Sequence, residues 1–106
     1  MRVQKTWGYE QLLFNQEYCQ KLLVYEKPIA SSLHYHEQKT ESFFVASGEF
    51  EVELNYEPPV TLKAGGWVHI PRKTLHRVRC IEPGTILEAS TRDDPEDCFR
   101  LVPSES

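Results

Sequence analysis

The sequence predicts an all-β domain built from short strands that form a sandwich or a closed barrel. Short apolar or alternating segments follow one another along the chain, and Gly, Pro and Ser residues separate them. Many short strands spaced in this way are typical of β-sandwiches and β-barrels. The segment 49–54 alternates cleanly, so its apolar residues share one face and its glutamates the other. With 106 residues, the chain can bury one hydrophobic core and is expected to be one domain.

Eight strands are expected in chain order. They cover residues 21–25, 32–36, 42–46, 49–55, 60–63, 67–71, 76–81 and 85–91. Ser47-Gly48 is expected to close a tight hairpin, because Gly accepts a positive φ. One short helix is expected at residues 8–16, and the tail 103–106 is expected to fray.

Composition excludes several classes of protein. The chain is 40% apolar and 26% charged, which describes an ordinary soluble protein. A net charge of −4 without a basic cluster argues against nucleic-acid binding. No apolar run approaches the roughly 18 residues of a membrane span, and the N-terminus does not resemble a signal peptide. Three cysteines without paired spacing favour a reducing, cytoplasmic setting.

Three histidines and one glutamate form a candidate ligand set for a metal ion. His34 and His36 are two residues apart, so on a strand both imidazoles leave the same face. Glu41 opens the next apolar run, and His76 follows a turn that re-enters a strand. These donors suit one divalent transition metal, namely Zn, Mn, Fe, Ni or Co. The fourth histidine, His69, is expected to be an ordinary strand residue.

Periodicity leaves the inward face of the last strand undecided. One face of residues 85–91 carries Ile86, Glu88 and Ser90, and the other carries Leu87, Ala89 and Thr91. Both sets mix polar and apolar residues. The choice matters because inward side chains of a barrel converge on its ligand.

The ligand set resembles the first motif of the cupin superfamily. That motif reads HxH, three or four residues, Glu, six residues, Gly, and the chain matches it at His34, His36, Glu41 and Gly48. The second motif is matched at Gly65, Pro71 and His76. Three positions depart from the motifs: Lys73 replaces a glycine, Cys80 replaces an asparagine, and Pro28 takes the opening glycine position. The resemblance implies a single jelly-roll β-barrel over residues 1–106 with a short N-terminal arm, the first motif at about 28–48 and the second at about 65–80.

A closer likeness covers nearly the whole chain. Four segments are similar to the cupin half of bacterial mannose-6-phosphate isomerases: Lys5–Glu10, Ser32–Gly48, Ile70–Arg77 and Glu96–Leu101. The likeness implies an isomerase that acts on a sugar or sugar phosphate. It also implies that the metal supports the negative charge of an enediolate.

The same likeness suggests four further site residues. Glu88 is the first candidate for the catalytic base, the alternative being a solvated glutamate on the outer face. Lys39 is the second catalytic candidate, placed to meet a phosphate or a sugar hydroxyl. Lys21 and Arg100 are candidate substrate-binding residues, as anion contacts or as salt bridges at the barrel rim.

Two other functions stay open at this point. Three histidines and one glutamate also serve oxygen chemistry in non-haem iron dioxygenases of the cupin superfamily. A non-catalytic metal- or sugar-binding module is the other alternative. Cupins generally dimerise, so a homodimer is expected, with the apolar N-terminal residues Trp7, Tyr9 and Leu12–Phe14 at or near its interface.

Overall fold

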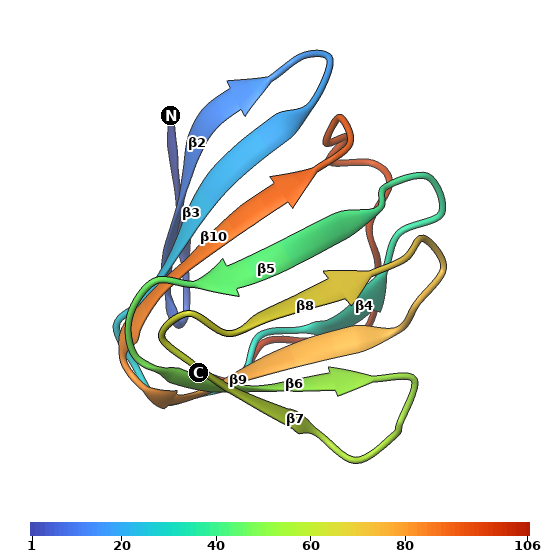
Figure 1. The fold of residues 1–106 in the computed structure, drawn as a ribbon. Helices are drawn as coiled ribbons and strands as arrows, with labels where there is room; N and C mark the ends of the chain where they lie inside the picture. Colours follow the sequence, from blue (N-terminus) through green and yellow to red (C-terminus); the bar gives the residue numbers. More distant parts are fainter.

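The computed structural model describes residues 1–106 and consists of two antiparallel β-sheets that pack face to face (Figure 1). In spatial order, the six-stranded sheet contains β1 (Arg2–Lys5), β2 (Gly8–Asn15), β3 (Cys19–Tyr25), β10 (Gly84–Ser90), β5 (Glu41–Val45) and β8 (Trp67–Ile70). The five-stranded sheet contains β11 (Phe99–Val102), β4 (Leu33–Tyr35), β9 (His76–Glu82), β6 (Glu49–Leu54) and β7 (Val60–Lys63). The predicted all-β jelly-roll fold is confirmed, and each of the eight predicted strands is present. No helix able to cross a membrane occurs in the structure.

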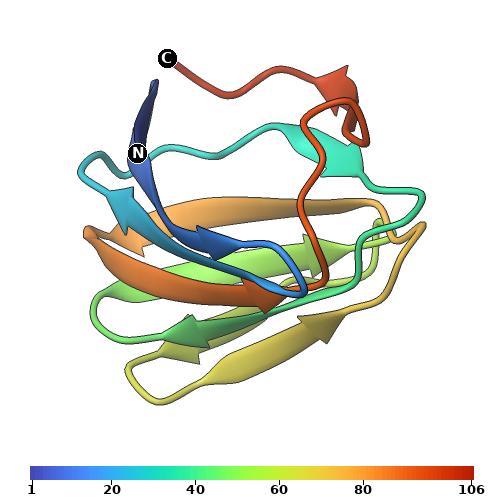
Figure 2. The ribbon, with the colours of Figure 1, turned by 90° about the horizontal axis from the view of Figure 1, so that it is seen from above.

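The core lies between the two sheets and takes side chains from both; Figure 2 shows the same strands from above. In β6 the predicted alternation is confirmed, since Phe50 and Val52 are fully buried. Tyr25 packs edge-on against Phe50 and stacks on Trp7, with ring centroids 4.0 Å apart in the stacked pair. Trp7 is 3% exposed, so it belongs to the core and is not available to a dimer interface. The N-terminal segment is therefore two strands of the larger sheet and not a free arm.

The helix predicted at residues 8–16 is wrong, because this segment forms strand β2. β2 pairs antiparallel with β3 along its length and with β1 over Gly8–Gln11. The run Leu12-Leu13-Phe14 hides the alternation of a strand, because a bulge interrupts the register between Leu12 and Phe14. Backbone pairing on both sides outweighs the local preference for a helix.

The hairpin predicted at Ser47-Gly48 is also wrong. Gly48 does have a positive φ of 84°, but β5 and β6 lie in different sheets, so the turn carries the chain across the sandwich. A second crossing, at Gly84, packs against it: a Cβ at Gly84 would lie 2.2 Å from the carbonyl oxygen of Ser47. The glycines are needed for this close approach of two backbones.

The C-terminal tail is fixed and does not fray. The Glu105 N–H donates to the carbonyl oxygen of Ala30, and the Glu105 carboxylate accepts from the Ala30 N–H at 2.9 Å. The guanidinium group of Arg79 donates to both carboxylate oxygens of Glu105, at 3.1 and 2.7 Å. These bonds attach the end of the chain to β9 and to the segment before β4.

We expect the tail to loosen in acid. Hydrogen bonds from Arg79 and from the Ala30 N–H lower the pKa of Glu105 from 4.5 to about 2. A lowered pKa stabilises the fold above the ordinary value of 4.5, and this contribution is lost as the pH falls towards 2. The parent should therefore melt at a higher temperature than Glu105→Gln. This difference should be largest above pH 4.5 and should become smaller as the pH falls below that value. Glu57→Gln, at an exposed glutamate without an ion pair, is the control. If the difference in melting temperature between the parent and Glu105→Gln does not depend on pH, the ionised Glu105 does not hold the tail.

Candidate metal centre and ligand cavity

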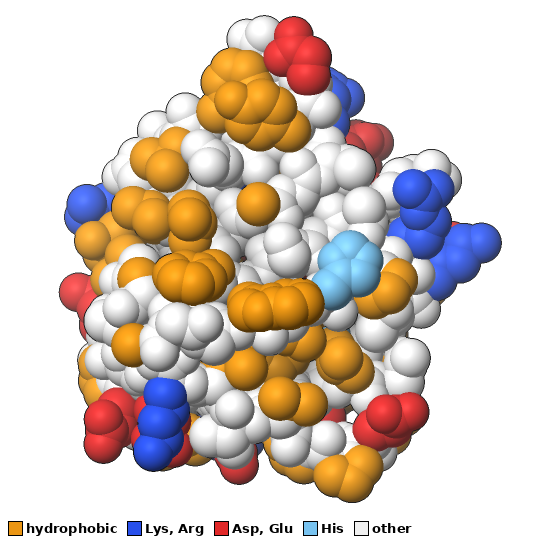
Figure 3. Space-filling model, in the orientation of Figure 1, with side chains coloured by type: hydrophobic (Ala, Val, Ile, Leu, Met, Phe, Trp, Pro, Cys, Tyr) orange, Lys and Arg blue, Asp and Glu red, His pale blue; other side chains and the backbone are white.

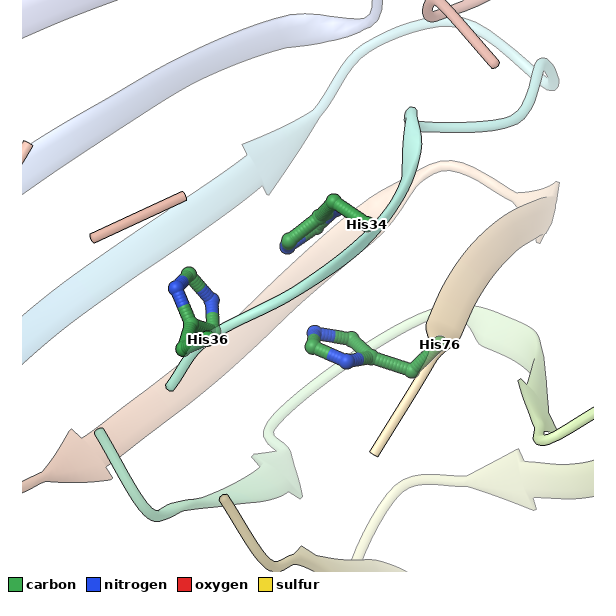
Figure 4. Close-up of side chains that lie close together, drawn as sticks. All are labelled: His34, His36 and His76. Atoms are coloured by element: carbon green, nitrogen blue, oxygen red, sulfur yellow. The ribbon is translucent and has the colours of Figure 1, made fainter. Parts of the chain in front are cut away.

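The three histidines of the predicted ligand set come together between the sheets (Figure 4). His34 lies on β4 directly opposite His76 at the start of β9, and His36 follows β4. One ring nitrogen from each histidine lies within 4.8 Å of the others. The imidazoles therefore form a cluster that can hold one metal ion.

Each histidine is oriented by a backbone carbonyl group. The Nδ1 atoms of His34, His36 and His76 lie 3.1, 2.6 and 2.9 Å from the carbonyl oxygens of Ser32, Asp97 and Thr74. Since a carbonyl oxygen only accepts, Nδ1 of His36 and of His76 carries the hydrogen and Nε2 keeps a lone pair. His34 Nδ1 also lies 3.0 Å from the hydroxyl group of Ser32. Such second contacts hold metal-ligating imidazoles in a fixed tautomer and direction.

Glu41 completes the set from the opposite sheet. Its Oε1 lies 3.0 Å from His76 Nε2 and 3.6 Å from His36 Nε2. Neither Glu41 Oε1 nor His76 Nε2 has a partner with hydrogen-bond geometry, although both atoms are fully buried. Lone pairs of the carboxylate and of a neutral imidazole thus face one another, which is unfavourable unless a cation lies between them. This donor set fits a divalent metal.

The protonation states suit metal binding. Burial, followed by the neighbouring histidines, lowers the pKa of His34 to about 3, and burial also lowers the pKa of His36. Burial alone would raise the pKa of Glu41, but its contact with His76 and the charge of Lys39 outweigh burial and lower the pKa. The imidazoles of His34 and His36 are therefore neutral and the carboxylate of Glu41 is ionised, as metal ligation requires.

Lys73, which replaces a glycine of the second cupin motif, still forms the turn of that motif. Lys73 takes a positive φ of 65°, a conformation that glycine adopts without strain and lysine does not. Its N–H donates to the carbonyl oxygen of His36 at 2.6 Å. The turn before β9 is thereby bonded to the segment that carries a candidate ligand.

The side chain of Glu88 points inward, which decides the question that periodicity left open. Ile86 and Glu88 are 0% and 4% exposed, whereas Ala89 is exposed to solvent. Burial and the charge of Glu41 raise the pKa of Glu88 to about 7, against the opposing charge of Lys39. A buried carboxyl group with a pKa near neutrality can both accept and release a proton.

Lys39 links Glu88 to the histidine cluster. Its ammonium group lies 3.3 Å from Glu41 Oε2, 3.1 Å from Glu88 Oε2 and 2.9 Å from Asp93 Oδ1. Burial would lower the pKa of Lys39, but these three carboxylates raise it, so the side chain is a fixed positive charge. Lys39 is 5% exposed and is therefore part of the interior, not of the surface.

All eight predicted site residues line one cavity of about 310 Å³. They are His34, His36, Glu41, His76, Glu88, Lys39, Lys21 and Arg100. Lys21 is half-buried, 3.3 Å from Glu10 and 3.1 Å from Asp93. Arg100 lies on β11 beside His34, is exposed and makes no ion pair. The volume lies at the lower end of the range for small-molecule pockets.

Two aspartates of the segment between β10 and β11 belong to the site although the sequence did not predict them. Asp93 pairs with both Lys39 and Lys21, and the side chain of Asn15 bonds to its backbone N–H and carbonyl oxygen. The carboxylate of Asp97 accepts hydrogen bonds from three consecutive N–H groups, those of residues 37–39. Both lie in the acidic run 93–97, where no residue spacing distinguishes one carboxylate from another.

We expect Asp97→Ala to weaken metal binding by up to about 10- to 100-fold, the usual effect of disturbing an orienting partner. The substitution keeps the backbone carbonyl group that orients His36, but it removes the carboxylate whose bonds to the N–H groups of residues 37–39 hold the two segments together. Metal titration of the purified apoprotein measures the effect. Asp97→Asn keeps one carbonyl acceptor and should fall between the parent and Asp97→Ala. The neighbouring, exposed Glu96→Ala is the control, and equal affinities for all four proteins would contradict the role.

The sequence matches the family described as Cupin domain over residues 23–89. This match spans more than half of the chain and includes every candidate metal ligand. The protein therefore belongs to the cupin family. No curated protein matches the sequence.

Solved structures show the same fold at low sequence identity. KdgF from Halomonas sp. is 20% identical with a TM-score of 0.75, over 83% of this chain and 81% of that one. An RmlC-like cupin from Shewanella frigidimarina is 22% identical with a TM-score of 0.74, over 83% and 78% of the two chains. Oxalate decarboxylase from Bacillus subtilis is 15% identical with a TM-score of 0.81, over 95% of this chain and 30% of the larger one. At these identities the likeness shows the fold alone.

Proposed function

We propose that this cupin is a metal-dependent isomerase that interconverts an aldose and a ketose, as a free sugar or a sugar phosphate. The proposal follows the likeness to the cupin half of bacterial mannose-6-phosphate isomerases. The observation that carries it is the position of Glu88, whose buried carboxylate lines the same cavity as the histidine cluster. Its Oε2 is bonded to Lys39, and its Oε1 has no protein partner.

The reaction needs a base that moves a proton between C1 and C2 of the sugar. Glu88 takes this role, and its pKa of about 7 matches the demand for a group that gains and loses a proton. The ammonium group of Lys39 holds Glu88 in place and supplies positive charge beside the substrate oxygens. A divalent metal held by His34, His36, Glu41 and His76 would stabilise the negative charge that develops on those oxygens.

Solvent exchange tests the proposal directly. The protein is loaded separately with Zn, Mn, Fe, Ni or Co and incubated without oxygen in deuterated water with aldoses, ketoses and their phosphates. We expect deuterium to enter at C2 of at least one sugar, as proton NMR detects. Absence of exchange for every sugar and every metal would overturn the isomerase. Fe(II)-dependent oxygen consumption would then indicate a dioxygenase, and sugar binding without turnover would indicate a binding module.

We also propose that the protein is a cytoplasmic homodimer. Hydrophobic side chains spread over the face seen in Figure 3, and the outer side of the six-stranded sheet exposes Phe44, Trp67 and, on β2, Leu13. Three free cysteines, two of them buried, support a reducing location. Light scattering at micromolar concentration should give twice the mass of the 12.4 kDa chain. A monomeric mass would contradict the dimer.

A further inference from the structure

We infer that the substrate of this site is an uncharged polyhydroxyl compound, a free sugar and not a sugar phosphate. The inference rests on the proposed function and narrows it. It follows from the charges that line the cavity and from the way in which they are already paired.

The ammonium groups inside the cavity are occupied by carboxylates of the protein. Lys39 lies within 3.3 Å of three of them, and Lys21 lies within 3.3 Å of two. Lys5 lies 3.8 Å from Glu10. A phosphate monoester would have to displace these partners. Each displaced carboxylate would lose its cation, and those of Glu41 and Glu88 would be left buried without one.

The side chains of the cavity wall offer a dianion no net positive charge beyond that of the metal ion. Four cationic side chains and five acidic ones line the cavity. The carboxylates are Glu10, Glu41, Glu88, Asp93 and Asp94. A phosphate group carries about −1.5 to −2 charges at neutral pH, and proteins bind it through free Arg or Lys side chains. Arg100 is the one cation of the wall without an ion pair, and it is exposed, so the wall offers a phosphate group no buried, unpaired Arg or Lys.

The same wall suits hydroxyl groups. An ionised carboxylate accepts hydrogen bonds and donates none. A sugar offers a hydroxyl donor on nearly every carbon, so it can bond to Glu88, Asp93 or Glu10 without breaking their contacts with lysine. A site that bonds a hydroxyl group discriminates strongly against ligands without a donor at that position.

Equilibrium binding to the zinc-loaded protein tests the inference without relying on turnover. Calorimetry compares a panel of free aldohexoses and ketohexoses with their 6-phosphates. We expect the matching free sugar to bind at least about tenfold more tightly, a modest effect for one unfavourable charge contact. Equal or tighter binding of the phosphates would overturn the inference. If the inference holds but the proposed isomerase activity does not, the protein binds the free sugar selectively and no deuterium enters at C2.

Two variants test the pairing of the lysines. Asp93→Asn removes the carboxylate shared by Lys39 and Lys21, so it should shift selectivity towards the phosphates. Asp94→Asn removes the same charge from the wall but frees neither lysine, and should shift selectivity less. Melting curves establish that both proteins are folded. If selectivity between free sugars and phosphates shifts equally in the two variants, the pairing of the lysines does not determine it. The comparison of free sugars with phosphates in the parent protein does not depend on whether the variants fold.

Discussion

Replacing His36 by Ala is expected to abolish stoichiometric metal binding. Loss of an orienting contact alone costs about 10- to 100-fold in affinity, so loss of a ligand should exceed about 100-fold. The remaining donors cannot compensate, because backbone carbonyl groups fix the directions of His34 and His76. Elemental analysis of protein purified without chelators, followed by zinc titration of the apoprotein, measures the loss.

His69→Ala is the matched control for this experiment. His69 lies on β8 and is exposed, so its removal deletes an imidazole without touching the cluster. The parent and His69→Ala should each bind one divalent ion per chain. Unchanged metal content in His36→Ala would refute the assigned centre.

Replacing Glu88 by Gln is expected to lower isomerisation about 10²- to 10⁴-fold, the usual scale for loss of a general base. Glutamine keeps the size of the side chain and one oxygen that accepts from Lys39, but it cannot take up a proton. Glu88 is not among the metal ligands, so metal content should stay the same. The deuterium-exchange rate, measured with the sugar that exchanges fastest in the parent, gives the effect.

Glu82→Gln provides the control for this substitution. Glu82 ends β9 and is exposed, so the same chemical change there should leave the exchange rate within error of the parent. If Glu88→Gln and Glu82→Gln are equally active, the base is another group. Loss of metal from Glu88→Gln would instead show that its role is structural.

The strands could be predicted because alternation is a local property of the sequence. In 49–54 the pattern alone places Phe50 and Val52 in the core, as the structure confirms. The prediction failed where the structure depends on distant segments. The strand at Leu12–Phe14 requires pairing with β3 and a bulge, and the turn at Ser47-Gly48 requires the approach of Gly84.

The same division holds for the site. The four candidate metal ligands could be chosen because their types and spacing carry the chemistry, and the structure brings them together. The inward face of Glu88 could not be settled, because both faces of β10 mix polar and apolar residues. Asp93 meets Lys39 across a sequence separation of 54 residues, a contact that no local pattern encodes.

The candidate ligands come from both layers of the sandwich, and this links metal supply to folding. His34 and His76 belong to the five-stranded sheet, whereas Glu41 begins β5 of the six-stranded sheet. A chain in which the sheets have not yet closed lacks the complete set, so the ion binds the native state in preference to open or unfolded ones. Mass action then raises the unfolding free energy by about 2.7 kcal/mol at a hundredfold excess of metal over Kd. A bound ion would thus act as a reversible cross-link between the sheets, and the lifetime of the protein would depend on the free metal concentration around it.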